Sequence, residues 1–156
     1  MTGGNYGIAD VALALKFVHD NAALIGGNSN KIVINGESAG SFAVMALLLH
    51  DPSAELISGA IAQSGGTISN FMGTMEDASM NILISQVCAE IENCDQSENV
   101  ENQINQLKNT ADAKQLFNLA TEKIPRFGPV PHDGVFYTAN ALDKYLNNNL
   151  NTNFKV

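Results

Sequence analysis

A short stretch around residue 38 most constrains how this chain can fold. A β-branched run, Ile-Val-Ile at residues 32–34, leads into Gly-Glu-Ser-Ala-Gly at residues 36–40. Residues 39–49 follow, rich in Ala and Leu and without Pro, which predicts a helix. A strand, a Gly-x-Ser-x-Gly turn and a helix in this order are the context of a nucleophile elbow. We therefore expect Ser38 to stand on a very sharp turn with a strained backbone.

The residue types beside Ser38 fit this interpretation. Gly36 and Gly40 have no Cβ, so the strand and the helix can approach each other closely on both sides. The helix begins just past Ser38 and points unbonded backbone N–H groups toward the place where negative charge would develop. The N–H of Ala39 is then the candidate oxyanion donor. The competing interpretation is a glycine-rich strand–helix turn with an incidental serine; the flanking strand and helix favour the elbow.

Composition bounds the remaining possibilities. With 156 residues, 45% hydrophobic and 15% charged, the chain is long and apolar enough for one domain with a real core. The 16 acidic residues against 8 basic ones give a formal charge of −8, which argues against a nucleic-acid partner. No run reaches the length of a membrane span. The first five residues show neither the basic nor the apolar region of a signal peptide, and the spacing of the cysteines and histidines predicts no metal site.

The first half of the chain predicts a β-α-β unit. Apolar positions spaced by three and four predict a helix over residues 6–24, and glycines at 26 and 27 end it. Residues 31–35 are too apolar for an edge strand and predict a buried parallel strand. The helix after Ser38 should stop before Pro52, and residues 59–63 predict a second strand, parallel to the first. Ligands of such sheets bind beyond the carboxyl ends of the strands, where Ser38 and Ser64 both lie.

The second half predicts mostly helices. We expect three domain segments: a core at residues 1–74 that bears the candidate nucleophile, a helical excursion at 75–124, and a turn, a helix and the start of a strand at 125–156. Helices are predicted at residues 78–91, 95–108, 111–121 and 140–146. The proline-rich residues 125–131 should be irregular, and Asp133 should form a turn through its own side-chain hydrogen bonds.

The ordered motifs of this chain resemble the type-B carboxylesterases, the carboxylesterase/cholinesterase branch of the α/β-hydrolase fold. The segments that carry the resemblance are residues 4–10 (Gly-Asn-Tyr-Gly-Ile-Ala-Asp), 14–21, 26–27, 34–41 (Ile-Asn-Gly-Glu-Ser-Ala-Gly-Ser), 60–65 and 127–134 (Phe-Gly-Pro-Val-Pro-His-Asp-Gly). They occur in the family's order, densely from residue 4 to 66 and sparsely from 75 to 124. Phe17 stands where the family usually has tryptophan, and Asn28-Ser29 stand where it usually has Asp-Pro.

The resemblance implies a fold class and a reaction. The fold would be α/β, a partial α/β-hydrolase fold with a mostly parallel sheet, flanking helices and a helical excursion. Ser38 would be the nucleophile of a carboxylic-ester hydrolase, would form an acyl-enzyme with a small-molecule ester and would need no cofactor. Glu37 would be a buried structural carboxylate. Family members are several times longer, and in them the glycine-rich oxyanion loop lies upstream of the matched segment while the acid and histidine of the triad lie downstream of it.

The resemblance also shapes what we expect of the chain by itself. It matches the central part of an esterase, so we expect residues 1–156 to show no useful turnover alone. The family is mostly secreted or in the secretory pathway. The substrate is not specified: a choline ester would need aromatic side chains around its cation, and this chain has no Trp and 6% aromatic residues. The alternative function is a non-catalytic adhesion or binding module of the same fold, against which the intact Ser38 argues.

Other titratable residues are weaker candidates for the site. His132 follows Ser38 with acids between them, but it falls at the variable position of a turn that has a packing role in the family. His19 is expected on a helix surface, and His50 ends the helix at the opposite end from Ser38, where it can interact with the helix dipole. Ser64 either lines the floor of the site or simply ends a strand.

The sequence also bears on whether the two cysteines, Cys88 and Cys94, form a disulfide. Cys94 resembles the first cysteine of a family disulfide loop, but its usual partner is replaced near Asn105. A bridge from Cys88 to Cys94 would have to cross a helix end within the short Cα separation that a disulfide allows. We therefore expect two free, buried thiols.

Overall fold

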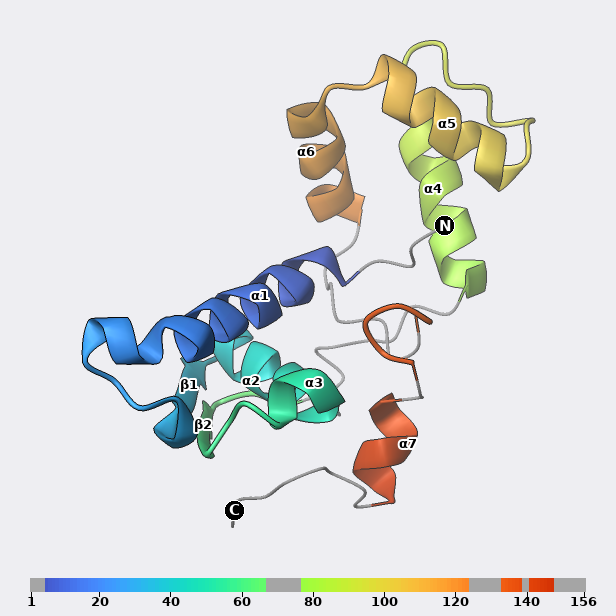
Figure 1. The fold of residues 1–156 in the computed structure, drawn as a ribbon. Coiled ribbons are helices and arrows are strands. Elements are labelled where there is room, and N and C mark those ends of the chain that lie inside the picture. Colours follow the sequence, from blue (N-terminus) through green and yellow to red (C-terminus); the bar gives the residue numbers. More distant parts are fainter. Residues whose placement is uncertain (1–4, 67–76, 124–132, 139–140, 148–156) are drawn as a thin grey trace. The chain divides into compact units, whose positions relative to one another are not determined.

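The computed structural model describes residues 5–66, 77–123, 133–138 and 141–147 (Figure 1). The chain divides into two compact units, one of residues 1–72 and 129–156 and the other of residues 73–128. The boundaries that we predicted at residues 74/75 and 124/125 lie outside the described residues.

The first unit carries the predicted β-α-β arrangement. Its elements, in chain order, are α1 (Tyr6–Asn21), the 3-10 turns Ala22–Ile25 and Ser29–Lys31, β1 (Val33–Glu37), α2 (Ala39–Leu49), α3 (Asp51–Ala54), β2 (Gly59–Gln63) and α7 (Ala141–Leu146). The helix of residues 39–49 and the strand of residues 59–63 are confirmed. The first helix is shorter than predicted because a 3-10 turn follows Asn21, and Gly26 at φ 76° closes that turn. The short α3, which has Pro52 in its first turn, was not predicted.

The two strands are parallel, as predicted. Val33 pairs with Gly59 and Glu37 with Gln63, so both strands end at the same sheet edge. The prediction of a buried strand is wrong, however, because β1 alternates between exposed and half-buried residues and the Val33 side chain is 58% exposed. The physical reason is that, in the described part of the chain, β1 pairs with β2 alone, and the even-numbered positions are the ones that face the helical core.

The core of this unit forms around α2, which packs on both strands and against α1. One cluster of buried residues joins α1, α2 and the approach to β2: Leu15, Val44, Leu47, Leu48 and Ile57. A second cluster joins α2 to α7 and consists of Ala46, Leu49, Tyr137 and Ala141. The buried hydroxyl of Tyr137 donates to the carbonyl oxygen of Ala46 at 2.9 Å, which satisfies both groups in the core.

The Asp133 turn holds residues 133–137 against the core. Asp133 Oδ1 accepts hydrogen bonds from the backbone N–H groups of Val135, Phe136 and Tyr137 at 2.9–3.1 Å, and its Oδ2 accepts from the Asn5 side chain at 2.9 Å. The predicted role of Asp133 as a turn former is confirmed. Partial burial works against ionisation, but these donors together outweigh it and hold the pKa of Asp133 below its usual range.

In its described residues, 77–123, the second unit is a set of three helices. They are α4 (Asp77–Cys88), α5 (Val100–Thr110) and α6 (Ala113–Lys123), around a core of Leu83, Val87, Cys88, Ile91 and Leu107. Helix α5 begins later than predicted because Asn99 caps it, accepting from the N–H of Asn102 at 2.9 Å. The buried Gln103 is fully bonded: it accepts from the Ser85 hydroxyl and donates to the carbonyl oxygens of Gln96 and Glu98.

The prediction of free thiols is wrong. Cys88 and Cys94 form a disulfide, with their Cα atoms 5.2 Å apart. The helix end is not an obstacle, since α4 stops at Cys88 and the chain turns back through consecutive turns. In these turns the N–H of Ile91 donates to Cys88 and the N–H of Cys94 donates to Ile91. The bridge therefore ties the end of α4 to the segment that leads into α5.

The disulfide should stabilise the helical unit by limiting the freedom of the unfolded chain. For a closed loop this short, the chain-entropy model gives about 2 kcal/mol. We expect reduction, or the double substitution Cys88→Ala/Cys94→Ala, to lower the free energy of unfolding by this amount in urea titrations. Complete alkylation of both thiols in the non-reduced native protein, detected by mass spectrometry, would contradict the bridge.

Candidate functional site

Ser38 stands at a sharp reversal between β1 and α2. Its backbone has φ 52° and ψ −115°, a conformation that L-residues rarely adopt. Two hydrogen bonds hold it there: the Ser38 N–H donates to the Gln63 carbonyl oxygen at 2.9 Å, and the Ser38 carbonyl oxygen accepts from the Phe42 N–H at 3.2 Å. The residue is exposed, so the strained turn places Ser38 at the surface rather than in the core.

The turn depends on a very close approach of strand to helix. A Cβ at Gly36 would lie 2.2 Å from both the carbonyl carbon and the oxygen of Gly40, which no side chain can do. A Cβ at Gly40 would meet no heavy atom within 4 Å. The two glycines that we expected to act alike therefore differ: Gly36 must lack a side chain, whereas at Gly40 only the backbone is crowded.

A second contact supports the turn from β2, and the sequence reasoning missed it. Ser41 is completely buried, and its hydroxyl donates to the Gly65 carbonyl oxygen at 2.9 Å. A Cβ at Gly65 would lie 2.7 Å from the Ser38 carbonyl oxygen and 2.9 Å from Ser41 Cβ. The sequence did contain a signal for this contact. Gly65 stands two residues after β2, and β2 pairs with β1, the strand that leads into Ser38.

The parallel register brings the two predicted serines to the same end of the sheet. Glu37 and Gln63 are paired, and Ser38 and Ser64 each follow one of them. Ser64 is exposed and has φ 56°, so both serines have a positive φ at the carboxyl ends of their strands. This is where ligands of parallel sheets bind.

The two residues next to Ser38 have different environments from each other. Ala39 is the first residue of α2, whose N-terminus has no side-chain cap; the first N–H groups of a helix have no acceptor within it. The Ala39 N–H is thus available to an anion at the turn. The implied buried carboxylate at Glu37 is wrong for this structure, since Glu37 is exposed on a strand with one described neighbour.

The described histidines do not contact Ser38. His19 Nδ1 lies 3.3 Å from the Asp20 carboxylate on the surface of α1, as expected. His50 Nδ1 lies 2.7 Å from the Ser53 hydroxyl, and its ring stacks on Phe136 with centroids 3.9 Å apart. His132 lies outside the described residues. A general base for Ser38 is therefore not found in the part of the chain that the structure describes.

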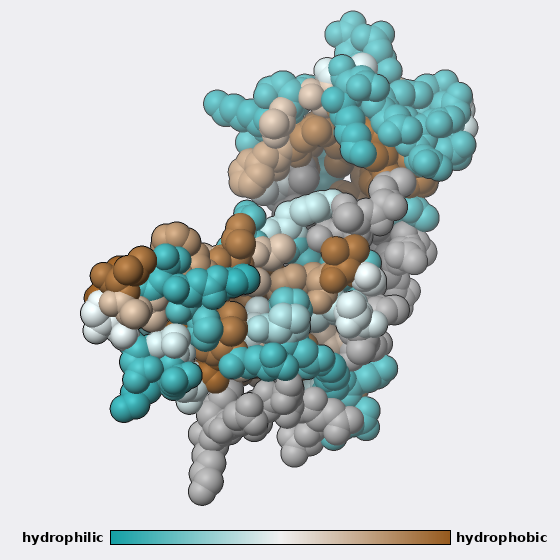
Figure 2. Space-filling model, viewed as in Figure 1, coloured by the Kyte–Doolittle hydropathy of each residue, from teal (hydrophilic) through white to brown (hydrophobic). Residues whose placement is uncertain are grey.

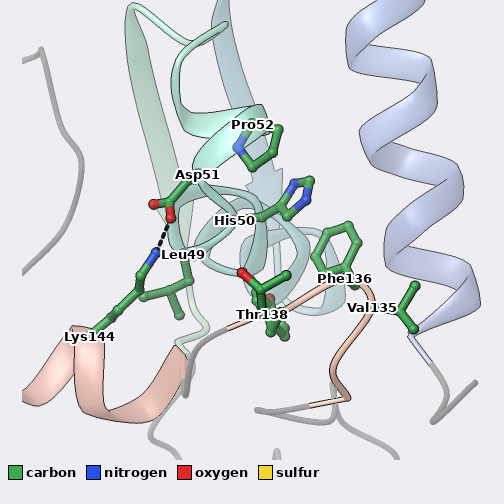
Figure 3. Close-up of a pocket in the computed structure, with 9 residues that line it drawn as sticks. Leu49, His50, Asp51, Pro52, Val135, Phe136, Thr138 and Lys144 are labelled. Carbon is green, nitrogen blue, oxygen red and sulfur yellow. Dashed lines mark hydrogen bonds and ion pairs between the residues drawn. The ribbon is translucent and has the colours of Figure 1, made fainter.

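His50 belongs to a separate small cavity of about 100 Å³ between α2, α3, α7 and the Asp133 turn (Figure 3). Lys144 pairs with Asp51 at one side of it, and Phe136 faces the imidazole ring at the other. Burial lowers the pKa of His50; the nearby Asp51 opposes this and Lys144 adds to it. The contacts of His50 are those of a packing residue that joins α2 to the Asp133 turn.

No helix among the described residues is long and apolar enough to span a membrane. In the same residues, no three His, Cys, Asp or Glu side chains gather as a metal site would require.

Comparison with known proteins shows the family to which the chain belongs. The model of the carboxylesterase family matches residues 1–154, so the chain belongs to the carboxylesterase family. The chain is 45% identical to a juvenile hormone esterase of Tribolium castaneum over 65 residues, which are 42% of this chain and 11% of that protein. It is 40% identical to a human cocaine esterase over 93 residues, 60% of this chain and 16% of that protein.

A longer alignment covers most of the chain. Carboxylesterase 5A of Canis lupus familiaris is 31% identical over 140 residues, which are 90% of this chain and 23% of that protein. The chain thus spans less than a quarter of the length of these curated relatives. A helix-rich α/β unit with a small parallel sheet is compatible with part of the α/β-hydrolase fold that the family implies.

The crowding at Gly36 gives a matched pair of substitutions. Gly36→Ala should destabilise the first unit by about 3 kcal/mol or more, because its Cβ would overlap the Gly40 backbone. Gly40→Ala, four residues away, should change stability by no more than about 1 kcal/mol, since its Cβ enters open space in a helix. Urea unfolding monitored by circular dichroism measures both, and equal losses would contradict the geometry of the turn.

His50 should make stability depend on pH. Its folded pKa is lowered, so the unfolded chain binds a proton more readily; the stability contributed by neutral His50 is present above its ordinary pKa of 6.5 and is lost as pH falls below it. We expect His50→Gln to lose this part of the pH dependence in unfolding titrations at pH 7.5 and 5.5, while the wild-type chain retains it. An unchanged dependence in His50→Gln would contradict the assignment.

Proposed function

We propose that Ser38 is the nucleophile of a carboxylic-ester hydrolase and that the Ala39 N–H is one oxyanion donor. The observation that carries the proposal is the backbone of Ser38, held at φ 52° between a strand and a helix N-terminus in a chain of the carboxylesterase family. A serine in this position is exposed on one side and has helix N–H groups beside it on the other.

The proposed reaction follows from these two groups. The Ser38 hydroxyl attacks the ester carbonyl, its proton passes to a general base, and the carbonyl oxygen becomes an oxyanion near the Ala39 N–H. Collapse of this intermediate expels the alcohol and leaves an acyl group on Ser38, which water then removes. Gly36, Ser41 and Gly65 hold the turn on which Ser38 stands. The substrate class is a small-molecule carboxylic ester.

The general base is the part that the described residues do not supply. His19 and His50 are bonded elsewhere, and the acid and histidine expected from the family resemblance fall beyond the motifs of this chain. We therefore propose that the nucleophile is provided by these residues and that the rest of the triad comes from a longer carboxylesterase polypeptide. If that longer polypeptide lacks the acid and the histidine, the protein would instead be a binding module of the same fold.

Turnover of a short-chain aryl ester tests whether these 156 residues supply the nucleophile but not the general base. The purified 156-residue chain should hydrolyse the ester no faster than Ser38→Ala does, because a serine without a base is a weak nucleophile. Ser64→Ala is the matched control, a second exposed serine at the same end of the sheet. A rate well above background in the wild-type chain that disappears in Ser38→Ala alone would overturn the proposed need for outside residues.

A further inference from the structure

Ser41 carries a buried hydroxyl in the first turn of α2, and the proposed reaction gives this hydroxyl no part. Hydrophilic residues cover much of the visible surface of both units, where water satisfies their polar groups (Figure 2). Ser41 is 0% exposed, so its hydroxyl depends on a partner within the protein. A serine inside a helix often bonds the carbonyl oxygen four residues earlier, but the Ser41 hydroxyl donates to the Gly65 carbonyl oxygen at 2.9 Å. The bond therefore joins α2 to the segment after β2.

Gly65 lies directly between Ser41 and the backbone of Ser38. A Cβ on Gly65 would be 2.7 Å from the Ser38 carbonyl oxygen and 3.1 Å from Ser41 Oγ. The same short segment is attached to Ser38 a second time, because the Ser38 N–H donates to the Gln63 carbonyl oxygen at 2.9 Å. Ser64, which has φ 56°, stands between these two attachments.

The two hydrogen bonds close a ring around the turn. The ring crosses from the Ser38 N–H to the end of β2, follows the chain, and returns through the Ser41 hydroxyl and the first turn of α2; its members are residues 38–41 and 63–65. Ala39, whose N–H is the proposed oxyanion donor, is one of them. The two residues of the ring that have a positive φ, Ser38 and Ser64, are thus held from both sides.

We propose that Ser41 is a positioning residue for ester hydrolysis, a role that rests on the proposed function of Ser38. A strained backbone persists only where the surrounding structure holds it, so opening the ring would let Ser38 relax. Its hydroxyl and the Ala39 N–H would then leave the geometry that attack and oxyanion binding require. Because Ser41 has no exposed surface, it acts through these two groups rather than by contact with the ester.

Hydrogen exchange of the Ser38 amide, followed by NMR in the 156-residue chain, tests whether Ser41 closes the ring. In Ser41→Ala the Ser38 N–H should exchange about tenfold faster, because its bond to Gln63 loses the support of the attachment at Gly65. Amides in the middle of α2 report opening of the whole unit in the same spectra. Ser41→Cys, which keeps a weaker donor of similar size, should show a smaller increase.

Ser53→Ala is the matched control. Ser53 is 3% exposed, lies in the same unit and is bonded through its hydroxyl to His50, so this variant removes a buried hydrogen bond away from the turn. It should leave the exchange of the Ser38 N–H at the wild-type rate. Equal exchange of the Ser38 N–H in Ser41→Ala and Ser53→Ala would overturn the proposal.

Ester turnover tests the positioning role itself, in a full-length carboxylesterase polypeptide that contains these 156 residues. Ser41→Ala should lower kcat about tenfold and change KM less than about twofold, because the ring sets the position of the reacting groups. Ser53→Ala should leave both constants near those of the wild type. A larger effect of Ser41→Ala on KM than on kcat, or the same kcat in the two variants, would overturn the proposal.

Ser38→Ala separates this proposal from the function on which it rests. If turnover survives in Ser38→Ala, the proposed nucleophile is wrong, and the positioning role of Ser41 is overturned with it. If Ser38→Ala abolishes turnover while Ser41→Ala keeps the wild-type kcat, the nucleophile stands and only the role of Ser41 is overturned.

Discussion

The close approach of Gly36 to the backbone of Gly40 is the constraint on which the first unit depends. A strand can pass directly into a helix at Ser38 only because no side chain stands between them, and the cost is a serine in a rarely populated backbone conformation. The cost is offset by contacts on both sides. The Ser38 N–H is bonded to β2, and Ser41 and Gly65 lock the turn after β2 against the first turn of α2.

The rest of the unit holds α2 in place. Its buried side chains pack toward α1 on one side and toward Tyr137 and α7 on the other, which fixes the position of the helix that begins just after Ser38. The Asp133 turn, from a distant part of the chain, also supports this core. Its carboxylate accepts hydrogen bonds from the backbone of residues 135–137 and from the Asn5 side chain. The helical unit of α4, α5 and α6 has its own core, its own disulfide and its own buried amide network.

Much of the local structure could be predicted from the sequence, because local signals determine it. The β-branched run, the glycines around Ser38 and the proline after His50 identified β1, α2 and the turn between them, and the Asp133 turn followed from side-chain chemistry. The predictions that failed concern features that depend on contacts between distant residues. The burial of β1 and of Glu37 was inferred from apolarity and resemblance, but burial depends on how many strands neighbour them. The Cys88–Cys94 bridge was missed because a helix boundary was placed three residues too late.

We propose that the strained turn makes Ser38, among neighbouring serines, the reactive nucleophile. The most direct measurement is covalent labelling by an organophosphate in a full-length carboxylesterase polypeptide that contains these 156 residues, followed by peptide mass spectrometry. The label should be found on Ser38 and be absent from Ser41, which is buried, and from Ser64. A folded full-length protein whose Ser38 stays unlabelled, or whose label lies on Ser64, would contradict it.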